Sequence, residues 1–498
     1  MKKRIFSLLL AALMLCPLAA CAVDEGAGDP ATTTAAPSVG QADTTTEAPE
    51  TEPKYLDNIP EDLRYDGQTI NILQRTAHVK EMKADEITGE IVNDAIYERN
   101  RAVEDRFGIT FAFHDAEGTN TSHNIYAGVI TNSINAQDNA FQIIANYAYY
   151  GISLCQQGIY LNLHSIENLD LEQPWWNQDY IEEATVKNKM YYVVGDATPS
   201  AIERLVVTFV NRDLAKQYYP DLDLYQLARE GKWTVDKQME LAKTAYQDLD
   251  GNAAVDATDF FGLVVARKSV PIDALMASWE ITATKKNAAG DVEMALNTEH
   301  NIAATEKMLD LFFHSDGVYG KGSNGDARSK FASGEAIFTY DMMNQASTTL
   351  REVTFDYGIM PLPKYTEAQE AYHTTSHDEY SALSVPVTVP DAEMVGAVLE
   401  VMGAESYRKV RPVIFETAYK TKYLNDEASA QMFDYIVDGA VYDFGYIYSN
   451  LINNPVHQIR YQLYNFEDNT GLSAKLKMND KLCVKTLAAL VEKFDELP

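Results

Sequence analysis

Gln68-Thr69-Ile70-Asn71-Ile72-Leu73 and Phe141-Gln142-Ile143-Ile144-Ala145 are the two stretches of the 498-residue chain that decide its fold. Both are short apolar runs rich in β-branched residues, as buried strands are. Between them, residues 93–107 follow a helical period that ends at a glycine, residues 109–113 form another strand candidate, and residues 125–135 are helical again. This alternation is typical of a mostly parallel sheet covered by helices on both faces.

The same alternation continues further along the chain. The predicted strands are Tyr191–Val194, Leu205–Val210 and Ala336–Tyr340, and the predicted helices are Thr234–Ala245 and Pro390–Met402. From about Tyr55 onward the composition is globular, and the segment is too long for one compact core. The sequence therefore predicts an α/β protein with two lobes.

The N-terminal segment has the composition of a secretory signal. Lys2-Lys3-Arg4 is basic, and residues 5–15 are apolar but too short to span a bilayer. Leu18-Ala19-Ala20-Cys21 then resembles the lipobox of bacterial lipoproteins, which implies cleavage before Cys21 and attachment of diacylglycerol to its thiol. Residues 1–21 are thus predicted to be a signal peptide with a lipobox. The alternative is an ordinary signal peptide with an incidental cysteine.

Residues 22–54 consist largely of Thr, Ala, Pro, Asp and Glu, with Val23 and Val39 as the sizeable apolar side chains. Such a composition cannot bury a core, so a disordered tether is predicted. About thirty residues of this kind reach on the order of 30 Å or more. With lipid on Cys21, the tether would hold a domain at the extracellular face of the membrane, outside the cytoplasm.

The formal net charge of −32 argues against nucleic acid and phosphate-rich ligands as partners. A neutral or cationic small solute fits this charge better. Once Cys16 is removed with the signal and Cys21 carries lipid, Cys155 and Cys483 remain, far apart and without metal-type spacing. Both are interpreted as buried apolar side chains.

The sequence carries no G-x-S-x-G, H-E-x-x-H or G-x-x-x-x-G-K-[ST] motif, so no enzymatic activity and no required cofactor are predicted. His373 and His377 lie four residues apart and could share one face of a helix as metal ligands. The polar residues 374–376 between them favour a loop instead.

Five segments occur in a characteristic order along the chain. They are Val207–Leu214, a strand ending in Asn-x-Asp-Leu; Gly231–Thr234, a G-x-W-T helix start; Phe331–Phe338; Tyr357–Pro363; and Tyr380–Pro386. Together they resemble the extracellular solute-binding proteins of ABC importers, the class that includes maltose-binding protein. The resemblance implies a two-lobed periplasmic-binding-protein-like fold (type II), with solute held in a cleft between lobes that close around it.

The same resemblance predicts the lobe boundaries. The first lobe is expected at residues 60–200 and 385–447, and the second at residues 205–380 and 450–498. The chain would cross between lobes near residues 197–204, 381–385 and 446–454.

The resemblance also implies ligand-binding residues at the ends of strands. In the first lobe the candidates are Asn146, Tyr147, Tyr149, Trp175 and Trp176. Indole faces pack against the C–H faces of sugar rings, although at least one tryptophan of the pair is expected in the core.

At the first crossing, Glu203 and Arg204 either hydrogen-bond a polar ligand or stabilise the hinge. The candidates in the second lobe are Trp279, Asp341 and Asn344. Residues 342–344 are Met-Met-Asn where maltose-binding protein has an aromatic residue, which argues against maltodextrin itself as the ligand.

An acidic loop follows the order of an EF-hand-type calcium loop. Its candidate ligands are Asp248, Asp250, Asn252, the carbonyl of Ala254, Asp256 and Asp259. Glycine stands at position four of the loop and not at six, and the last ligand is Asp in place of Glu. A structural calcium ion and a solvated acidic turn are both compatible with this pattern.

Three functions are compared. The favoured one is a monomeric, lipid-anchored solute-binding protein that delivers a carbohydrate, in the form of an oligosaccharide, to the transmembrane subunits of an ABC permease. The second is a binding protein for a peptide or another polar solute, which fixed charges in the cleft would favour. The third, from another class, is a glycan-active surface enzyme or adhesin.

Overall fold

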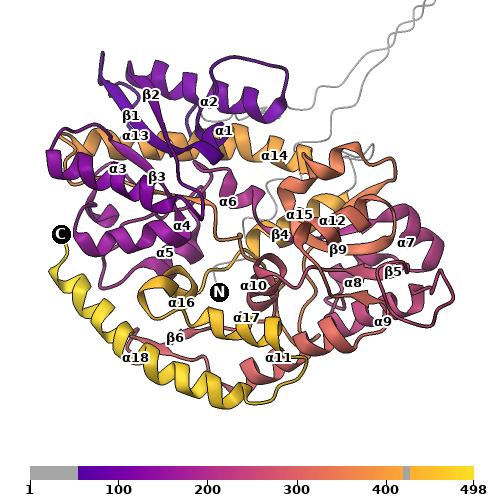
Figure 1. The fold of residues 1–498 in the computed structure, drawn as a ribbon. Coiled ribbons are helices and arrows are strands. Elements are labelled where there is room, and N and C mark those ends of the chain that lie inside the picture. Colours follow the sequence, from indigo (N-terminus) through magenta and orange to yellow (C-terminus); the bar gives the residue numbers. More distant parts are fainter. Residues whose placement is uncertain (1–53, 419–426) are drawn as a thin grey trace, which may run out of the picture. The chain divides into compact units, whose positions relative to one another are not determined.

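The computed structural model describes residues 54–418 and 427–498. The predicted signal peptide, Cys21 and all of the predicted tether except Lys54 lie outside the described residues. Lys54–Pro498 forms one unit of its own. Within it, two sheets and their helices lie side by side (Figure 1).

The first sheet confirms the strand and helix pattern that opens the globular part. Its strand order is β11-β3-β1-β2, with β1 (Thr69–Arg75), β2 (Thr110–Ala116) and β3 (Ile143–Tyr147) parallel and β11 (Ser381–Ser384) antiparallel. Helix α2 (Ile91–Phe107) connects β1 to β2 and ends at Gly108, whose φ of 71° is left-handed and suits glycine. Helix α3 (His123–Ala136) connects β2 to β3.

The second sheet has the order β10-β4-β9-β5-β8. Its strands are β4 (Val206–Asn211), β5 (Phe261–Val264), β8 (Val318–Tyr319), β9 (Ala336–Met342) and β10 (Tyr357–Met360). Strand β4 pairs antiparallel with both β9 and β10, whereas β5 is parallel to β8 and β9. Both sheets are therefore mixed: one strand, β11 in the first sheet and β4 in the second, runs opposite to the others, and the sequence did not predict these reversed strands.

Helices flank both sheets, and a hairpin of β6 (Thr284–Lys286) and β7 (Val292–Met294) stands apart. The predicted helix at residues 234–245 is α9 (Val235–Ala245), and its cap Thr234 accepts the N–H of Lys237. The predicted helix at residues 390–402 is α13 (Ala392–Glu405). The remaining helices are α1 (Val79–Met82), α4 (Ala148–Gly151), α5 (Gln178–Ala184), α6 (Ser200–Glu203), α7 (Arg212–Tyr218), α8 (Leu224–Arg229), α10 (Ser269–Ser278), α11 (Glu299–Leu309), α12 (Asn324–Ala332), α14 (Arg411–Ala418), α15 (Glu427–Asp438), α16 (Phe444–Ile447), α17 (Val456–Asn465) and α18 (Leu472–Glu496).

One predicted strand is wrong. Residues 191–194 are not a strand, because Val193 alone pairs with Leu383 at the edge of β11. The chain then turns at Gly195, where a Cβ atom would lie 2.2 Å from the carbonyl oxygen of Trp175. The apolar side chains of this segment are buried, which explains its strand-like sequence.

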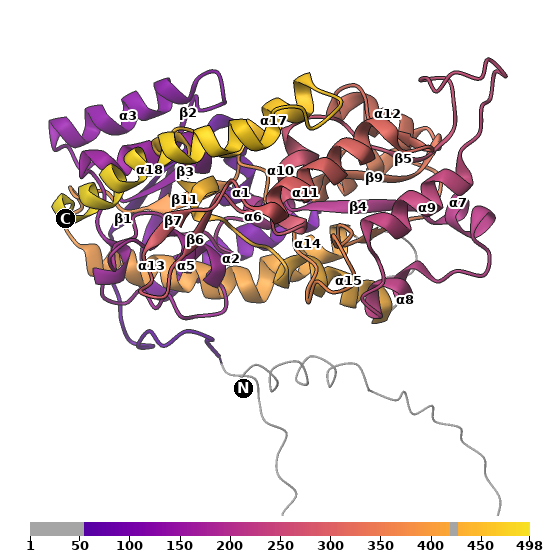
Figure 2. The same cartoon turned by 90° about the horizontal axis from the view of Figure 1, so that it is seen from below.

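Each sheet has its own core, and α18 contributes to both. Leu472 and Leu476 pack in the core of the second sheet, whereas Leu487, Leu490 and Phe494 pack in that of the first. Figure 2 shows α18 running past both groups of elements. The predicted lobe boundaries stay predictions, but this packing refines them, since α18 belongs to both lobes.

Helix α15 also departs from the predicted division. It contacts β10 and α8, and Phe433 and Ile436 share a core with Val207 and Phe209 of β4. It therefore packs on the second sheet, although its residues fall in the range expected for the first lobe. Among the described residues, no helix has both the length and the hydropathy needed to cross a membrane.

Candidate ligand-binding cleft

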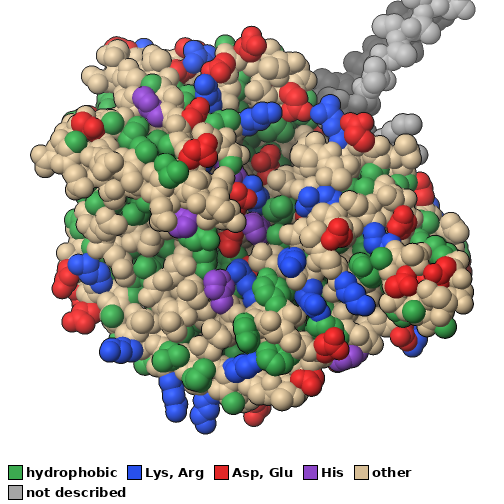
Figure 3. Space-filling model, in the orientation of Figure 1, with side chains coloured by type: hydrophobic (Ala, Val, Ile, Leu, Met, Phe, Trp, Pro, Cys, Tyr) green, Lys and Arg blue, Asp and Glu red, His purple; other side chains and the backbone are tan. Residues whose placement is uncertain are grey.

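A cavity of about 690 Å³ lies beside the first crossing segment. Residues from both sides border it. They include His78 and Glu81 after β1, Asn93 and Ile96 of α2, Glu203 and Arg204 of the crossing, and Met343, Asn344 and Arg351 after β9. Figure 3 shows the surface hollowed between the two sides, with charged and histidine side chains in the hollow. The predicted residues Glu203, Arg204 and Asn344 are thus brought together.

Glu379, just before the second crossing, contacts Arg204 of the first crossing and His78 beside this cavity. Its Oε2 lies 2.9 Å from Nη1 of Arg204, and its Oε1 lies 3.7 Å from Nε2 of His78. Burial alone would raise the pKa of Glu379, but the nearby imidazole of His78 and the positive charge of Arg204 lower this pKa to about 2. Glu379 is therefore a fixed negative charge at physiological pH, held where both lobes meet.

Arg75, at the carboxyl end of β1, is a buried cation next to this group. Its Nη2 donates to the carbonyl oxygen of Glu379 at 2.7 Å and to Oγ of Ser381 at 3.1 Å. Its guanidinium lies 4.6 Å from the ring centre of Tyr147. Nε and Nη1 of Arg75 have no hydrogen-bond partner among the described residues. No sequence motif marked Arg75, because a lone arginine at a strand end has no distinctive spacing.

An aromatic cluster lies after β3, where the sequence predicted a ligand-binding loop. Tyr150 stacks on His123 with ring centres 3.9 Å apart, and it meets Tyr147 and Tyr149 edge-on. Tyr147, Tyr150 and His123 border a cavity of about 300 Å³. Tyr150 and His123 are half-buried, so part of each ring faces solvent. The sequence analysis missed these two residues, although Tyr150 belongs to the quoted polar and aromatic run.

Tyr149 joins this cluster to the third crossing. Its hydroxyl donates to Oδ1 of Asn454 at 2.9 Å and lies 3.1 Å from Nε2 of His457 on α17. Burial raises the pKa of Tyr149 above its usual range, so the hydroxyl keeps its proton. A bound solute here would contact groups that connect the lobes.

A buried ion pair also lies next to Asp378, just before the second crossing. Nε of Arg460 donates to Oδ1 of Asp273 on α10 at 2.6 Å, and its Nη2 lies 3.8 Å from Oδ2 of Asp378. The hydroxyl of Tyr446 donates to the same Asp273 at 3.1 Å. Asp273 and Arg460 are both buried, so the pair is an internal ion pair and not a surface contact.

Several predicted contact residues are packed in the interior. Asn146 is 0 % exposed; its amide donates to Oγ of Ser384 at 2.6 Å, and its Oδ1 accepts from Tyr160. The sequence could not show this, because a polar residue at a strand end fits a cleft and a buried hydrogen bond equally well. The role of Asn146 as a ligand contact stays a prediction, and its bonds favour a structural role.

The three candidate tryptophans are also in the cores. Trp175, Trp176 and Trp279 are 2 %, 1 % and 0 % exposed. Nε1 of Trp176 donates to Glu400 of α13 at 3.1 Å, and Nε1 of Trp279 donates to the carbonyl oxygen of Pro363 at 3.0 Å. Little indole surface is left for a sugar. The sequence predicts at least one of Trp175 and Trp176 in the core, and both lie there.

Asp341 is held by Arg328 of α12 in a two-pronged ion pair, with N···O distances of 2.8 Å and 3.0 Å. It is buried beneath the residues after β9, so Asn344 is the more accessible of the two predicted residues.

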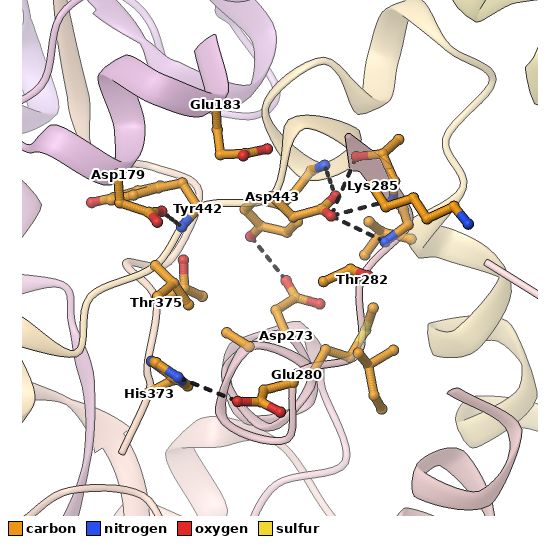
Figure 4. A pocket seen from close by; sticks show the side chains of 18 residues that line it. Asp179, Glu183, Asp273, Glu280, Thr282, Lys285, His373, Thr375, Tyr442 and Asp443 are labelled. Carbon is orange, nitrogen blue, oxygen red and sulfur yellow. Dashed lines mark hydrogen bonds and ion pairs between the residues drawn. The ribbon is translucent and has the colours of Figure 1, made fainter. Parts of the chain in front are cut away.

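A third cavity, of about 270 Å³, is strongly acidic (Figure 4). Its carboxylates are Asp179, Glu183, Asp273, Glu280 and Asp443, and the side chain of Lys285 extends away from them. Each of these carboxylates has a partner. Oδ2 of Asp443 accepts the N–H of Ala283 at 3.2 Å, and Asp179 accepts the N–H of Tyr442 at 2.5 Å. These bonds fix residues 442–443, just before the third crossing, to neighbouring elements.

His373 borders the same acidic cavity, 3.5 Å from Glu280, and His377 lies 3.6 Å from Asp378. Both stand in the irregular segment before β11 and not on a helix. The described residues contain no cluster of metal-ligating groups that includes either histidine.

Stability is expected to rise when the pH falls from 8 to 6.5. Burial raises the pKa of Asp443, Glu203 and Glu400 to about 7 each, above their values in the unfolded chain. In this window the folded state binds more protons than the unfolded state, so the free energy of unfolding increases as pH falls. The histidines with lowered pKa values begin to oppose this near pH 7, where histidines of the unfolded chain take up protons, and oppose it more strongly below about pH 6.5. The melting temperature should increase by several degrees.

Asp443→Asn is the matched variant for this pH effect. It keeps an oxygen that can accept the N–H groups and removes the titration, so its melting temperature should change less between pH 8 and pH 6.5. Differential scanning calorimetry at both pH values measures this. A parent protein that is more stable at pH 8 would contradict the assignment.

The acidic loop brings three carboxylates together. Ligand atoms of Asp248, Asp250 and Asp259 lie within 4.8 Å of one another. Asp248 already accepts the N–H groups of Gly251 and Ala253, and the buried Asp259 accepts the hydroxyl of Tyr246 at 2.9 Å. Calcium at this loop stays a prediction. Cys155 and Cys483 are free and buried, as expected.

No protein-family model and no curated protein matches the chain by sequence. Solved structures do match its fold. The GacH receptor of Streptomyces glaucescens GLA.O, solved unliganded and with acarbose, is 13% identical with a TM-score of 0.50, and the match covers 86% of this chain and 99% of that one.

Two further structures match equally broadly. The ABC substrate-binding protein Lmo0181 from Listeria monocytogenes, in complex with cycloalternan, has 13% identity and a TM-score of 0.50 over 85% of this chain and 100% of that one. A cyclo/maltodextrin-binding protein complexed with maltotetraose has 12% identity and a TM-score of 0.54 over 85% and 97%. The two-lobed fold expected from the sequence resemblance is therefore confirmed.

Proposed function

We propose that this protein is the solute-binding component of an ABC importer and captures an oligosaccharide outside the cytoplasm. Its fold matches three structures that were solved with carbohydrates, namely acarbose, cycloalternan and maltotetraose. The observation that carries the proposal is the aromatic cluster of Tyr147, Tyr149, Tyr150 and His123, which borders its own cavity near the lobe crossings.

Binding needs apolar ring faces and fixed polar groups together. Tyr150 and His123 offer partly exposed rings for the C–H faces of a sugar. Arg204, Glu379 and Asn344 offer donors and acceptors for hydroxyl groups beside the larger cavity. Residues of both lobes would then contact one solute, and such contacts stabilise whichever lobe arrangement makes most of them.

A peptide or another small polar solute is the second candidate. Arg204 and Glu379 are fixed charges beside the cavity, as recognition of charged termini would require. They form an ion pair with each other, whereas the rings of Tyr150 and His123, at the separate cavity of about 300 Å³, are partly exposed. The observations therefore favour the oligosaccharide.

A ligand screen tests the proposal. The melting temperature of the protein is measured with mono- and oligosaccharides, with peptides, and with polysaccharide. A ligand that binds the folded state raises the melting temperature by mass action, and calorimetry then gives its affinity. A shift with one class of oligosaccharide supports the proposal. If peptides alone raised the melting temperature, the ligand would be a peptide and not a sugar. Release of reducing ends from polysaccharide would indicate an enzyme.

Membrane anchoring through Cys21 is part of the same proposal, and the carbohydrate would pass to the transmembrane subunits of a permease. Replacing Cys21 by Ala should remove the site of lipid attachment, so the protein should move from the membrane fraction to the soluble or secreted fraction. Immunoblots of fractionated cells measure this, with Cys155→Ala as the control cysteine. Because residues 5–15 could hold an uncleaved variant at the membrane, lipid attachment is also measured by fatty-acid labelling, and label that persists on the Cys21→Ala protein would contradict attachment at Cys21.

A further inference from the structure

Helix α18 has two different faces. Leu476, Cys483 and Leu487 point into the protein and are buried. On the outer face, Lys477, Lys481 and Lys485 are exposed at intervals of four residues. Beside them Met478, Leu482 and Val484 are 57 %, 52 % and 54 % exposed. We call these six residues the basic apolar face.

The three lysines of this face lack an ion-pair partner among the described residues, although the whole chain carries a net charge of −32. Asp480 on the same helix points elsewhere and accepts the N–H groups of Leu296 and Asn297 at 3.0 Å each. Like charges four residues apart on a helix repel one another. The face thus keeps an unfavourable cluster of cations that the fold does not use.

The surroundings of this face have a similar character. In Figure 3, Lys and Arg side chains stand beside hydrophobic ones along the lower edge, where Figure 1 places α18. Tyr461 of the neighbouring α17 is half exposed, and Nζ of Lys475 lies 5.1 Å from its ring centre. Tyrosine has an apolar ring and a polar tip, and such residues favour the boundary between water and lipid.

We propose that the basic apolar face of α18 docks on a membrane surface that contains anionic lipids. Lysines attract anionic headgroups, and the methionine, leucine and valine side chains reach the boundary of the acyl chains, as in other interfacial helices. Charge complementarity favours this occupant, since the rest of an acidic protein would be repelled by the same surface. The proposal goes beyond solute binding and does not depend on it.

Vesicle binding tests this surface in the full chain with Cys21→Ser, so that no lipid is attached. Partitioning is measured by sedimentation on phosphatidylcholine vesicles with and without phosphatidylglycerol. The triple variant Lys477→Glu/Lys481→Glu/Lys485→Glu should partition roughly 100-fold more weakly to anionic vesicles, since each lysine contributes about fivefold near such a surface. Pure phosphatidylcholine vesicles report binding by the apolar residues 5–15, which all variants share.

The matched control, Lys216→Glu/Lys232→Glu/Lys321→Glu, makes the same change in net charge at exposed lysines outside α18. It should bind anionic vesicles within about twofold of the parent. Binding of the parent should weaken steeply between about 0.1 and about 0.5 M salt, because salt screens the attraction of lysines to anionic headgroups. Met478→Ser/Leu482→Ser keeps the lysines and should bind several-fold more weakly, and circular dichroism checks that every variant is folded.

Three results would overturn the proposal. The parent chain could show no preference for anionic vesicles, the charge-reversed triple variant could bind them as well as the parent does, or both triple variants could lose binding equally. Crosslinking of the basic apolar face to permease subunits in membranes, without any preference for anionic vesicles, would assign the face to a protein partner instead.

Discussion

Replacing Tyr150 by Ala is expected to weaken oligosaccharide binding by roughly 30-fold, which corresponds to about 2 kcal/mol. Tyr150 stacks on His123 and contacts Tyr147 and Tyr149 edge-on, so its ring holds the cluster together as well as facing solvent. Removing it deletes a stacking surface and loosens the rings around it. Isothermal titration calorimetry with the oligosaccharide found in the ligand screen measures the change.

Two comparisons make this result specific. Tyr150→Phe keeps the ring and should bind within a few-fold of the parent, because stacking needs the ring and not the hydroxyl. Tyr218 stacks on Phe260 beside the second sheet, with an interplanar angle of 9°, so Tyr218→Ala removes a similar ring pair at a different place. Affinities of Tyr150→Ala and Tyr218→Ala that both equal that of the parent would place the sugar elsewhere.

Replacing Arg460 by Met is expected to lower the free energy of unfolding by about 3–5 kcal/mol. The substitution leaves Asp273 buried without its cation, with Tyr446 as its remaining hydrogen-bond donor. Burial already raises the pKa of Asp273, and the charge of Arg460 opposes that shift. Urea unfolding at pH 7 and at pH 5 measures the loss, which should be smaller at pH 5 because protonation neutralises the stranded carboxyl group.

The double variant Asp273→Asn/Arg460→Met removes both charges and should recover most of the lost stability. If the stability were lost only because packing became poorer, removing the second charge would not recover it. Arg328→Met breaks the comparable pair with Asp341 on α12 and serves as a second measurement of an internal ion pair. If Arg460→Met and the double variant were equally unstable, packing and not charge would explain the loss.

The fold could be predicted from the sequence because its signals are local. Gly108 ends α2 where the helical period ends, and Thr234 caps α9. The two-lobed arrangement was predicted from the order of five segments along the chain, one of which is Phe331–Phe338. The segment at residues 191–194 failed because burial from all sides makes a loop as apolar as a strand, and only pairing with a neighbour distinguishes the two.

The candidate site was less predictable, because its residues depend on contacts between distant segments. Glu203, Arg204 and Asn344 were expected from their places along the chain, and they border one cavity. Glu379 and Arg75 lie 304 residues apart and meet only in the folded protein. The tryptophans were chosen for their chemistry with sugars, but the same large apolar surface makes them good core residues, and the core holds all three.

Helix α18 packs on both lobes and would resist their movement against each other. Its first turns are packed in one core and its last turns in the other, and a 25-residue helix is about 37 Å long. A rotation of one lobe against the other must bend this helix or separate it from one of the two cores. Elastic strain of this kind reduces the population of the strained arrangement, and the apparent affinity falls by the same factor. The stiffness of a helix far from the solute would then help to set how tightly the solute is held.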